Sequence, residues 1–222
     1  MWRDALLVAR RDLRIEGRSR VATNQVAPFA VLVLLLFAFA LDPDRGVLDR
    51  ATPGLYWIAV LLAGLLAITR STSLDEGDGI RDALRLSALD PPGIYLGKVA
   101  AVAAQLLALE ALLALGVVVL YDTEPSGVGL LLATCLAATL AVASAGVLYG
   151  ALVGGLRVRD TLLPVLLLPV LAPVLIGATR AFETALGDVA ADGWAWCGLV
   201  ASFAVVYLVA GSCVYGALLE DA

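Results

Sequence analysis

An acidic side chain, Glu110, stands in the middle of an apolar run. The run covers residues 94–121, and Gln105 lies about one and a half helical turns before the acid. Inserting an acid at the centre of a membrane helix costs roughly 2.5–3.5 kcal/mol, so such a residue is a candidate for function. We expect Glu110 either to line a transport pathway or moving interface, or to be a protonated acid that is hydrogen-bonded to another helix.

Three prolines interrupt a second apolar run, residues 162–179. Pro164, Pro169 and Pro173 each remove one helix hydrogen bond and crowd the preceding turn. The pattern predicts a kinked or interrupted helix, because freed carbonyls at membrane depth are tolerated only against protein or water. Such a helix suits a transport pathway or moving interface, and a static kinked packing helix is the alternative.

A polar stretch, residues 71–98, contains a second group of candidate residues. An acidic run with interspersed glycines leads into a short helical stretch, residues 80–89, which an Asp-Pro-Pro-Gly sequence ends. The acids Asp75, Glu76 and Asp78 lack the spacing of an EF-hand loop, so a solvated acidic turn is favoured over a metal site. A short helix held between two spans is a good lever for a cytoplasmic partner.

The stretch ends at Tyr95 and Lys98, which we expect to anchor the chain where it re-enters the membrane.

The composition indicates an all-α membrane protein. Of 222 residues, 61% are hydrophobic, and the mean hydropathy is +0.94, whereas soluble domains are about 45–50% apolar. About 20 apolar residues cross a hydrocarbon core of about 30 Å, and no run alternates like a membrane β-strand. Thr52 and Pro53 are expected to cap and begin the second span. The six expected spans are residues 21–41, 53–69, 94–121, 128–156, 162–179 and 194–219.

Basic residues predict the orientation. With the N-terminus in the cytoplasm, 12 of the 15 Lys and Arg residues fall on the inside, and six spans return the C-terminus there. The whole chain, residues 1–222, is then one transmembrane domain, because no polar stretch is long enough for a core of its own. A cleaved signal peptide fits less well, since the first apolar run exceeds the usual length of about 7–15 residues.

The first 20 residues predict an amphipathic helix lying on the membrane. Its basic side would face anionic headgroups, and a basic leader that only sets the topology is the alternative. The apolar face comprises Trp2, Ala5, Leu6, Ala9 and Leu13, and the basic face Arg3, Arg10, Arg14 and Arg18.

Residues that most metal and catalytic sites need are missing. The chain has no histidine, the commonest metal ligand and proton shuttle. Cys135, Cys197 and Cys213 lie inside expected spans without a C-x-x-C pair, so we expect them to pack as small apolar residues. No G-x-x-x-x-G-K-[ST], H-E-x-x-H or G-x-S-x-G motif occurs. We expect neither an enzyme nor a metal site.

The six-span layout, with a helical segment between spans two and three, resembles ABC-2-type permeases. Within that group the chain is similar to the membrane subunit of cytochrome c biogenesis haem exporters, the CcmB family. The similar stretches, in order, are RRDLRIEGRSR, TPGLYWIAVLLAGLLA, DEGDGIRDALRLSALDPPGIYLGKV and GLRVRDTLLPVLLLPVLAPVLIGAT. One departure is Arg81-Asp82, where the family usually has a glutamate after the glycine.

The resemblance implies a permease in the prokaryotic cell membrane that binds no cofactor itself. A CcmA-like ATPase subunit would use ATP and push on a coupling segment, residues 70–93, and haem is the expected cargo. A CcmC-like haem-handling membrane protein, a CcmE-like haem chaperone, membrane lipid and a second copy of the chain are the other expected partners, without nucleic acid. The expected ATPase contacts are Asp75, Glu76, Asp78, Gly79, Arg81, Leu84, Arg85 and Leu86.

Two other functions remain open. An ABC-2 permease could export a different cargo, such as a lipid-linked sugar or a drug. A membrane scaffold for assembling haem proteins would transport nothing and need no ATPase. An intramembrane enzyme has no catalytic group of residues to support it.

Overall fold

The computed structural model of the chain describes residues 1–19, 25–41, 45–76, 89–121, 127–154, 158–187 and 192–221. Within these ranges the regular structure is helical, so the all-α prediction is confirmed. The helices are α1 (Trp2–Ser19), α2 (Ala27–Leu41), α3 (Arg45–Glu76), α5 (Pro91–Tyr121), α6 (Val128–Val153), α7 (Arg159–Ala185) and α8 (Gly193–Asp221).

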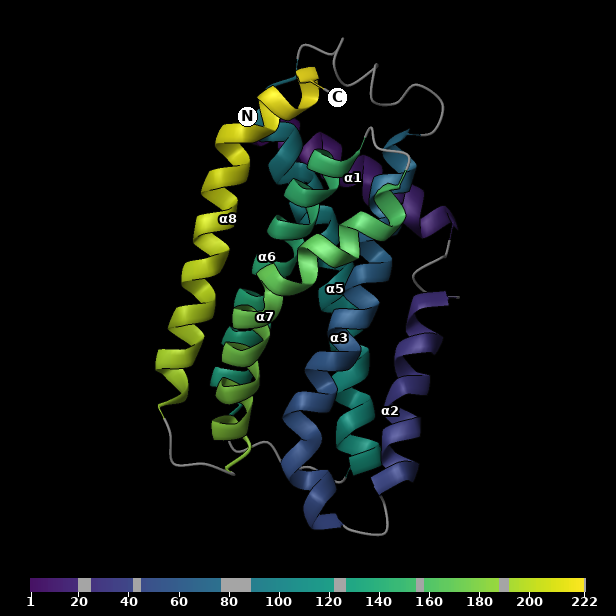
Figure 1. Cartoon of the computed structure of the whole chain (residues 1–222), viewed down its shortest axis with the longest axis vertical. Coiled ribbons are helices and arrows are strands. Elements are labelled where there is room, and N and C mark those ends of the chain that lie inside the picture. The colour runs from purple at the N-terminus through teal and green to yellow at the C-terminus, as the bar shows by residue number, and fades with distance from the viewer. Residues whose placement is uncertain are drawn as a thin grey trace.

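Helices α2, α3 and α5 to α8 form an elongated bundle, and α1 lies across one end of it (Figure 1). Both chain termini lie at that same end (Figure 1). Five helices, α3, α5, α6, α7 and α8, are long and apolar enough to cross a membrane, with candidate spans of 25–31 residues. The described part of the first expected span contains α2, a shorter apolar helix of 15 residues.

The helices extend beyond the apolar runs that predicted them. Helix α3 begins at Arg45 rather than at 53, and α7 covers Arg159–Ala185 rather than 162–179. The expected cap at Thr52 is wrong, because its hydroxyl donates to the Leu48 carbonyl in mid-helix at 2.9 Å. Pro53 removes one backbone hydrogen bond there, and the helix continues. Hydropathy finds the part of a helix that lipid can cover, whereas backbone hydrogen bonding decides where the helix ends.

The Asp-Pro-Pro-Gly sequence opens α5. The Asp90 carbonyl accepts the first helical hydrogen bond, from the Ile94 amide at 3.0 Å. Pro91 and Pro92 occupy the first turn, where the missing N–H groups have no partner in the helix. The same four residues therefore set the first turn of the next helix.

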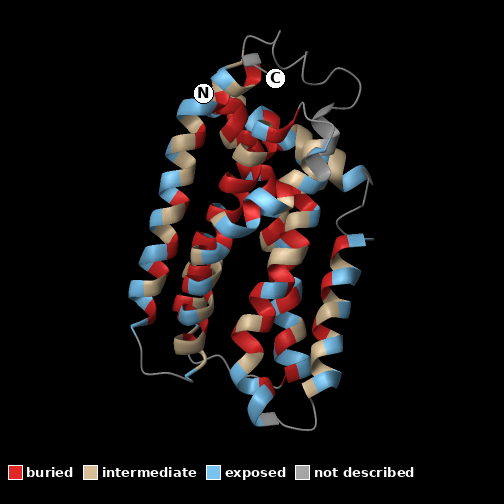
Figure 2. Ribbon diagram, viewed as in Figure 1, coloured by how far each residue is buried: buried red, intermediate tan, exposed pale blue. Residues whose placement is uncertain are grey.

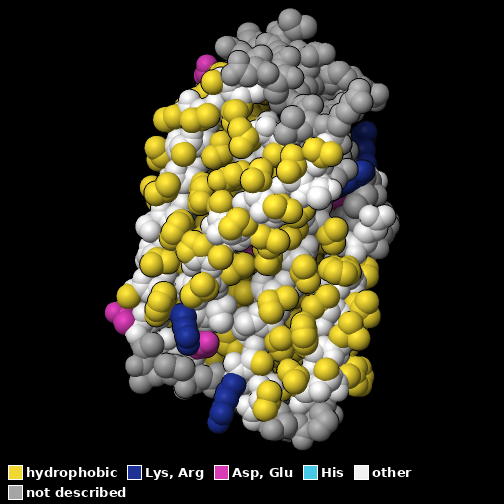
Figure 3. Space-filling view, in the orientation of Figure 1, with side chains coloured by type: hydrophobic (Ala, Val, Ile, Leu, Met, Phe, Trp, Pro, Cys, Tyr) yellow, Lys and Arg dark blue, Asp and Glu magenta, His cyan; other side chains and the backbone are white. Residues whose placement is uncertain are grey.

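Burial separates an interior from an apolar outer surface. Buried residues face the centre of the bundle (Figure 2), including Tyr56, Trp57 and Leu113 in one cluster and Ile68 and Tyr95 in another. Hydrophobic side chains also cover the visible outer face, with few charged side chains between the ends (Figure 3). An outer surface of this kind is stable in hydrocarbon and not in water.

Helix α7 bends as it crosses the bundle (Figure 1). It remains one continuous helix, so the prolines kink it without interrupting it. Pro164 and Pro173 are half-buried and Pro169 is exposed. The buried stripe of α7 consists instead of residues offset from the prolines: Leu163, Leu167, Leu171, Val174 and Ala178.

Candidate functional site

Glu110 lies in the interior of the bundle and is only 3% exposed. The Thr139 hydroxyl of α6 donates to its Oε1 at 2.6 Å. The other carboxyl oxygen, Oε2, is buried without a hydrogen-bond partner. The acid therefore bonds to another helix through a neutral hydroxyl.

A tyrosine of α3 completes the surroundings of the acid. The Tyr56 hydroxyl donates to the Glu110 backbone carbonyl at 3.2 Å and lies 3.7 Å from the Cys135 Sγ of α6. Its ring stacks on Phe182 of α7, with ring centroids 5.0 Å apart. This group of residues, the Glu110 cluster (Tyr56, Glu110, Cys135 and Thr139), thus joins α3, α5 and α6 and contacts α7.

The cluster differs from the expected site in its members. Sequence reasoning singled out Glu110 and assigned Cys135 only to packing, while Thr139 and Tyr56 carried no signal of their own. The contact with α7 is made through Phe182, nine residues beyond Pro173. No group of three or more His, Cys, Asp or Glu residues that could hold a metal occurs within the described part of the chain.

The role of Glu110 in stability can be separated from a role of its charge. We expect Glu110→Ala to cost about 2 kcal/mol, because it leaves a small cavity and a Thr139 hydroxyl without its acceptor. Glu110→Gln keeps an acceptor oxygen, so its unfolding free energy should stay within about 0.5 kcal/mol of the original. Thermal unfolding in detergent measures both. Equal losses in the two variants would show that the hydrogen bond does not stabilise the fold.

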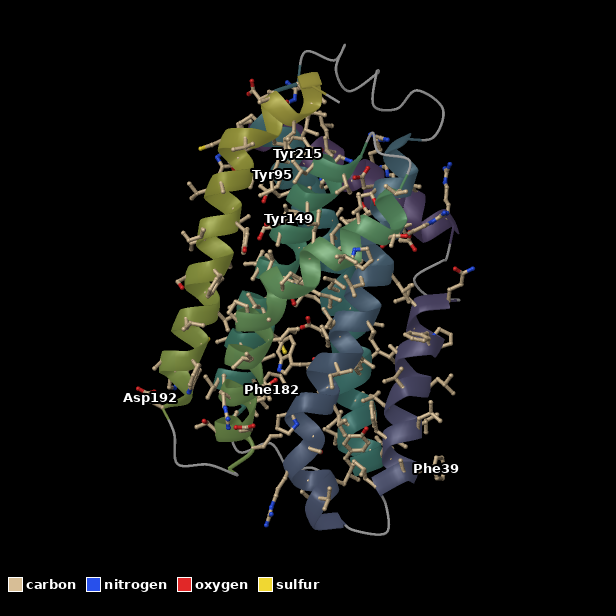
Figure 4. All side chains as sticks on the ribbon, viewed as in Figure 1. Phe39, Tyr95, Tyr149, Phe182, Asp192 and Tyr215 are labelled. Carbon is tan, nitrogen blue, oxygen red and sulfur yellow. The ribbon has the colours of Figure 1, made fainter. Side chains whose placement is uncertain are left out.

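The start of α5 is fixed by contacts with other helices. Tyr95 is fully buried, and its hydroxyl lies 3.1 Å from the Ser144 carbonyl of α6 and 2.9 Å from the Tyr207 carbonyl of α8. Its ring packs against that of Tyr215, near the C-terminal end of α8 (Figure 4). Tyr95 therefore anchors α5 to protein, rather than to the membrane surface as its position in the sequence had suggested.

Lys98 is also buried, with 2% exposure. Its Nζ lies 3.8 Å from Asp12 Oδ2 of α1, and Asp12 in turn lies 3.9 Å from Arg11 Nε. A buried lysine needs such a partner because desolvation of an ammonium is expensive. The expected anchor at Lys98 is thus an ion pair between α1 and α5.

Glycines let α1 approach α5 closely. A Cβ built at Gly97 would lie 2.6 Å from the Ala5 carbonyl oxygen and 2.7 Å from Val8 Cβ.

At the beginning of α1, the Met1 amine donates to Asp90 at 2.9 Å and to Asp4 at 3.0 Å. These hydrogen bonds, that to Asp90 first, raise the pKa of the amine.

The apolar face of α1 has two different surroundings. Ala5, Val8 and Ala9 are buried, whereas Trp2 and Leu6 are exposed. The apolar stripe is split because its small residues pack on α5, and the larger ones point away from the protein. The exposed large residues remain available for a membrane surface, as an interfacial helix requires.

Most of the expected ATPase contacts lie outside the described residues. These are Asp78, Gly79, Arg81, Leu84, Arg85 and Leu86. Asp75 and Glu76 belong to the last turn of α3, which continues past the expected end of the second span at 69, and their side chains are not described.

Comparison with known proteins shows a family relationship over nearly the whole chain. A family model described as CcmB protein matches residues 3–220. Heme exporter protein B of Haemophilus influenzae is 33% identical over 184 residues, 81% of each chain. The proteins of the same name from Paracoccus denitrificans and Bradyrhizobium diazoefficiens are 31% and 32% identical, over 80% of each chain. With these relatives and its long apolar helices, the chain is a multi-pass membrane protein that belongs to the CcmB family of heme exporter proteins.

Proposed function

We propose that the chain is the permease subunit of an ABC transporter complex for cytochrome c maturation. Membership of the CcmB family over residues 3–220 carries this proposal. The chain forms the transmembrane part, and ATP hydrolysis belongs to a separate CcmA-like subunit, in agreement with the absence of a phosphate-binding loop from the sequence. A CcmC-like membrane protein, a CcmE-like chaperone, lipid and a second copy of the chain complete the proposed partners.

The proposed topology has six spans with both ends in the cytoplasm. Helix α2 lies within the first proposed span, residues 21–41. The location of both termini at one end of the bundle (Figure 1) and the distribution of 12 of 15 basic residues support this topology. Helix α1 then lies at the cytoplasmic surface.

The output of the complex is either exported haem or the release of a haem-loaded chaperone. The chain has no histidine with which to ligate haem iron. This favours the second version, in which the permease turns ATP energy into movement that frees the chaperone. ATP acts through the partner subunit, and haem is cargo of the complex.

A substitution that introduces a charge into the coupling segment tests whether that segment couples the chain to the ATPase. We propose that the ATPase subunit contacts Asp75, Glu76, Asp78, Gly79, Arg81, Leu84, Arg85 and Leu86. Leu84→Asp places an unpaired carboxylate at that contact, and we expect at least a tenfold loss of cytochrome matured per ATP hydrolysed, equivalent to about 1.4 kcal/mol. ATPase assays and covalent haem staining measure the two quantities, with Leu84→Met as the control. Normal maturation in Leu84→Asp would contradict the proposed contact.

Glu110 and the prolines of α7 are proposed to belong to moving interfaces. Pro169 is exposed and so faces out from this chain, toward lipid or a neighbouring subunit, whereas Pro164 and Pro173 are half-buried. Glu110 instead lies between helices of the chain itself. The two therefore contribute to different interfaces.

The double variant Glu110→Ala, Pro169→Ala tests this assignment. We expect cytochrome maturation to fall about fivefold or more, equivalent to about 1 kcal/mol, because the variant alters both interfaces. Pro53→Ala, a proline replacement inside α3, is the control. Covalent haem staining measures the effect, and unaltered activity in the double variant would argue against a moving interface at either place.

Co-purification separates the remaining alternatives. A permease for another cargo would retain the ATPase subunit but leave cytochromes normal when deleted. A scaffold for haem-protein assembly would purify without any ATP-binding subunit.

A further inference from the structure

The first residues of α5 contact three other helices within little more than two turns. Asp90 accepts a hydrogen bond from the Met1 amine of α1, and Lys98 faces Asp12 of α1. Between them, Tyr95 reaches α6 and α8. This part of the chain, residues 90–98, is called the α5 entrance below. It follows directly on the segment that we propose to meet the ATPase.

The side chain of Tyr95 bridges two other helices at once. Its hydroxyl is near carbonyls of both Ser144 and Tyr207, and these belong to helices that pack along each other. A glycine of α8 makes the room: a Cβ at Gly211, one turn after Tyr207, would collide with the ring and hydroxyl of Tyr95. The absence of a side chain at Gly211 therefore permits the contact.

We infer that Tyr95 is a positioning residue that transmits movement of the α5 entrance to α6 and α8. This inference rests on the proposed function, because it assumes that the ATPase displaces the segment before α5. A hydroxyl held between two helical backbones moves them with the ring, since carbonyls inside a helix cannot shift singly. The Asp12–Lys98 pair and the Met1–Asp90 contact hold α1 against the α5 entrance, so that α1 moves with it.

The same helix supplies a matched control at its other end. Tyr121, the last residue of α5, is 4% exposed, and its hydroxyl donates to the Leu34 carbonyl of α2 at 3.0 Å. Tyr95→Phe and Tyr121→Phe therefore remove the same atom from the same helix, and both break bonds to a neighbouring backbone. They differ in their distance along α5 from the proposed ATPase contact.

The test measures coupling in the complete complex with its ATPase subunit. Covalent haem on c-type cytochromes is divided by the ATPase rate for the original chain and for each variant. We expect Tyr95→Phe to lower this ratio about five- to tenfold, the range that the loss of a hydrogen bond gives in an equilibrium constant. Both variants should lower the melting temperature by a similar amount, because each loses one hydrogen bond. Tyr121→Phe should leave the ratio of covalent haem to ATPase rate unchanged.

A second pair of variants covers the case in which Tyr95→Phe does not fold. Gly211→Ala pushes the Tyr95 ring from its place, whereas Gly198→Ala adds a methyl group to the same helix where nothing lies within 4 Å. The inference expects the coupling ratio to fall in the first variant only. An equal ratio in Tyr95→Phe and Tyr121→Phe, or in the two glycine variants, overturns it. If the original complex shows no ATP-dependent maturation, the proposed function itself has failed.

Discussion

Replacing Asp12 with leucine should destabilise the chain by about 3 kcal/mol, the lower end of the cost of breaking a buried ion pair. The change removes a carboxylate that faces the Lys98 ammonium, and that lysine is only 2% exposed. The lower end applies because the Asp12 side chain itself retains 16% exposure. Thermal or denaturant unfolding of the purified protein in detergent measures the loss.

The double variant Asp12→Leu, Lys98→Met provides the control. Replacing both members of a buried pair by apolar groups is often neutral, since no charge remains to be desolvated. We therefore expect the double variant to recover more than half of the stability that Asp12→Leu loses. If the double variant loses as much as the two single changes added together, the residues do not act as a pair.

Replacing Gly97 with leucine should separate α1 from α5 and cost about 3 kcal/mol, at the upper end for overpacked sites. The added Cβ would meet the Ala5 carbonyl oxygen at 2.6 Å, and a helical backbone cannot yield as a flexible side chain does. Because α1 carries Asp12, the same change also moves this carboxylate away from Lys98. Unfolding measurements report the loss, and cysteine cross-linking between α1 and α5 reports the separation.

Gly129→Leu is the matched control for this change. Gly129 lies in another apolar helix, α6, and a Cβ there meets nothing within 4 Å. It should therefore lose less than about 0.5 kcal/mol, as surface substitutions usually do. Equal stability of Gly97→Leu and Gly129→Leu would mean that α1 does not pack closely on α5.

Hydropathy predicted the membrane helices because lipid imposes a strong condition on composition. It placed α6 and α8 within a few residues of their ends. It missed the first eight and last seven residues of α3, and the first three and last six of α7. Charged side chains such as Arg50 and Arg180 interrupt the apolar runs there, whereas helicity depends on the backbone. The kink in α7 was predictable because proline acts locally, through its ring and missing N–H.

The site was less predictable because its contacts link distant parts of the sequence. Glu110 could be singled out by its cost in an apolar run, but its partner Thr139 lies 29 residues away on another helix. Tyr95 and Lys98 resemble surface anchors, since polar residues near the start of a span usually lie at the interface. Only the crossing of α1 over α5 shows that Lys98 has a carboxylate beside it in the protein.

The family resemblance predicted the function in more detail than composition could. The order of short similar stretches pointed to the CcmB family, and the match over residues 3–220 confirmed it. That relationship concerns the whole chain, whereas the proposed ATPase contacts depend on single residues such as Leu84 that lie outside the described structure.

Covalent haem staining of membranes from a strain that lacks this gene tests the central claim most directly. If the chain is the permease of a cytochrome c maturation complex, all c-type cytochromes vanish in the deletion strain and return when the gene is restored. Unchanged staining in the deletion strain would contradict that function and assign the permease to another cargo.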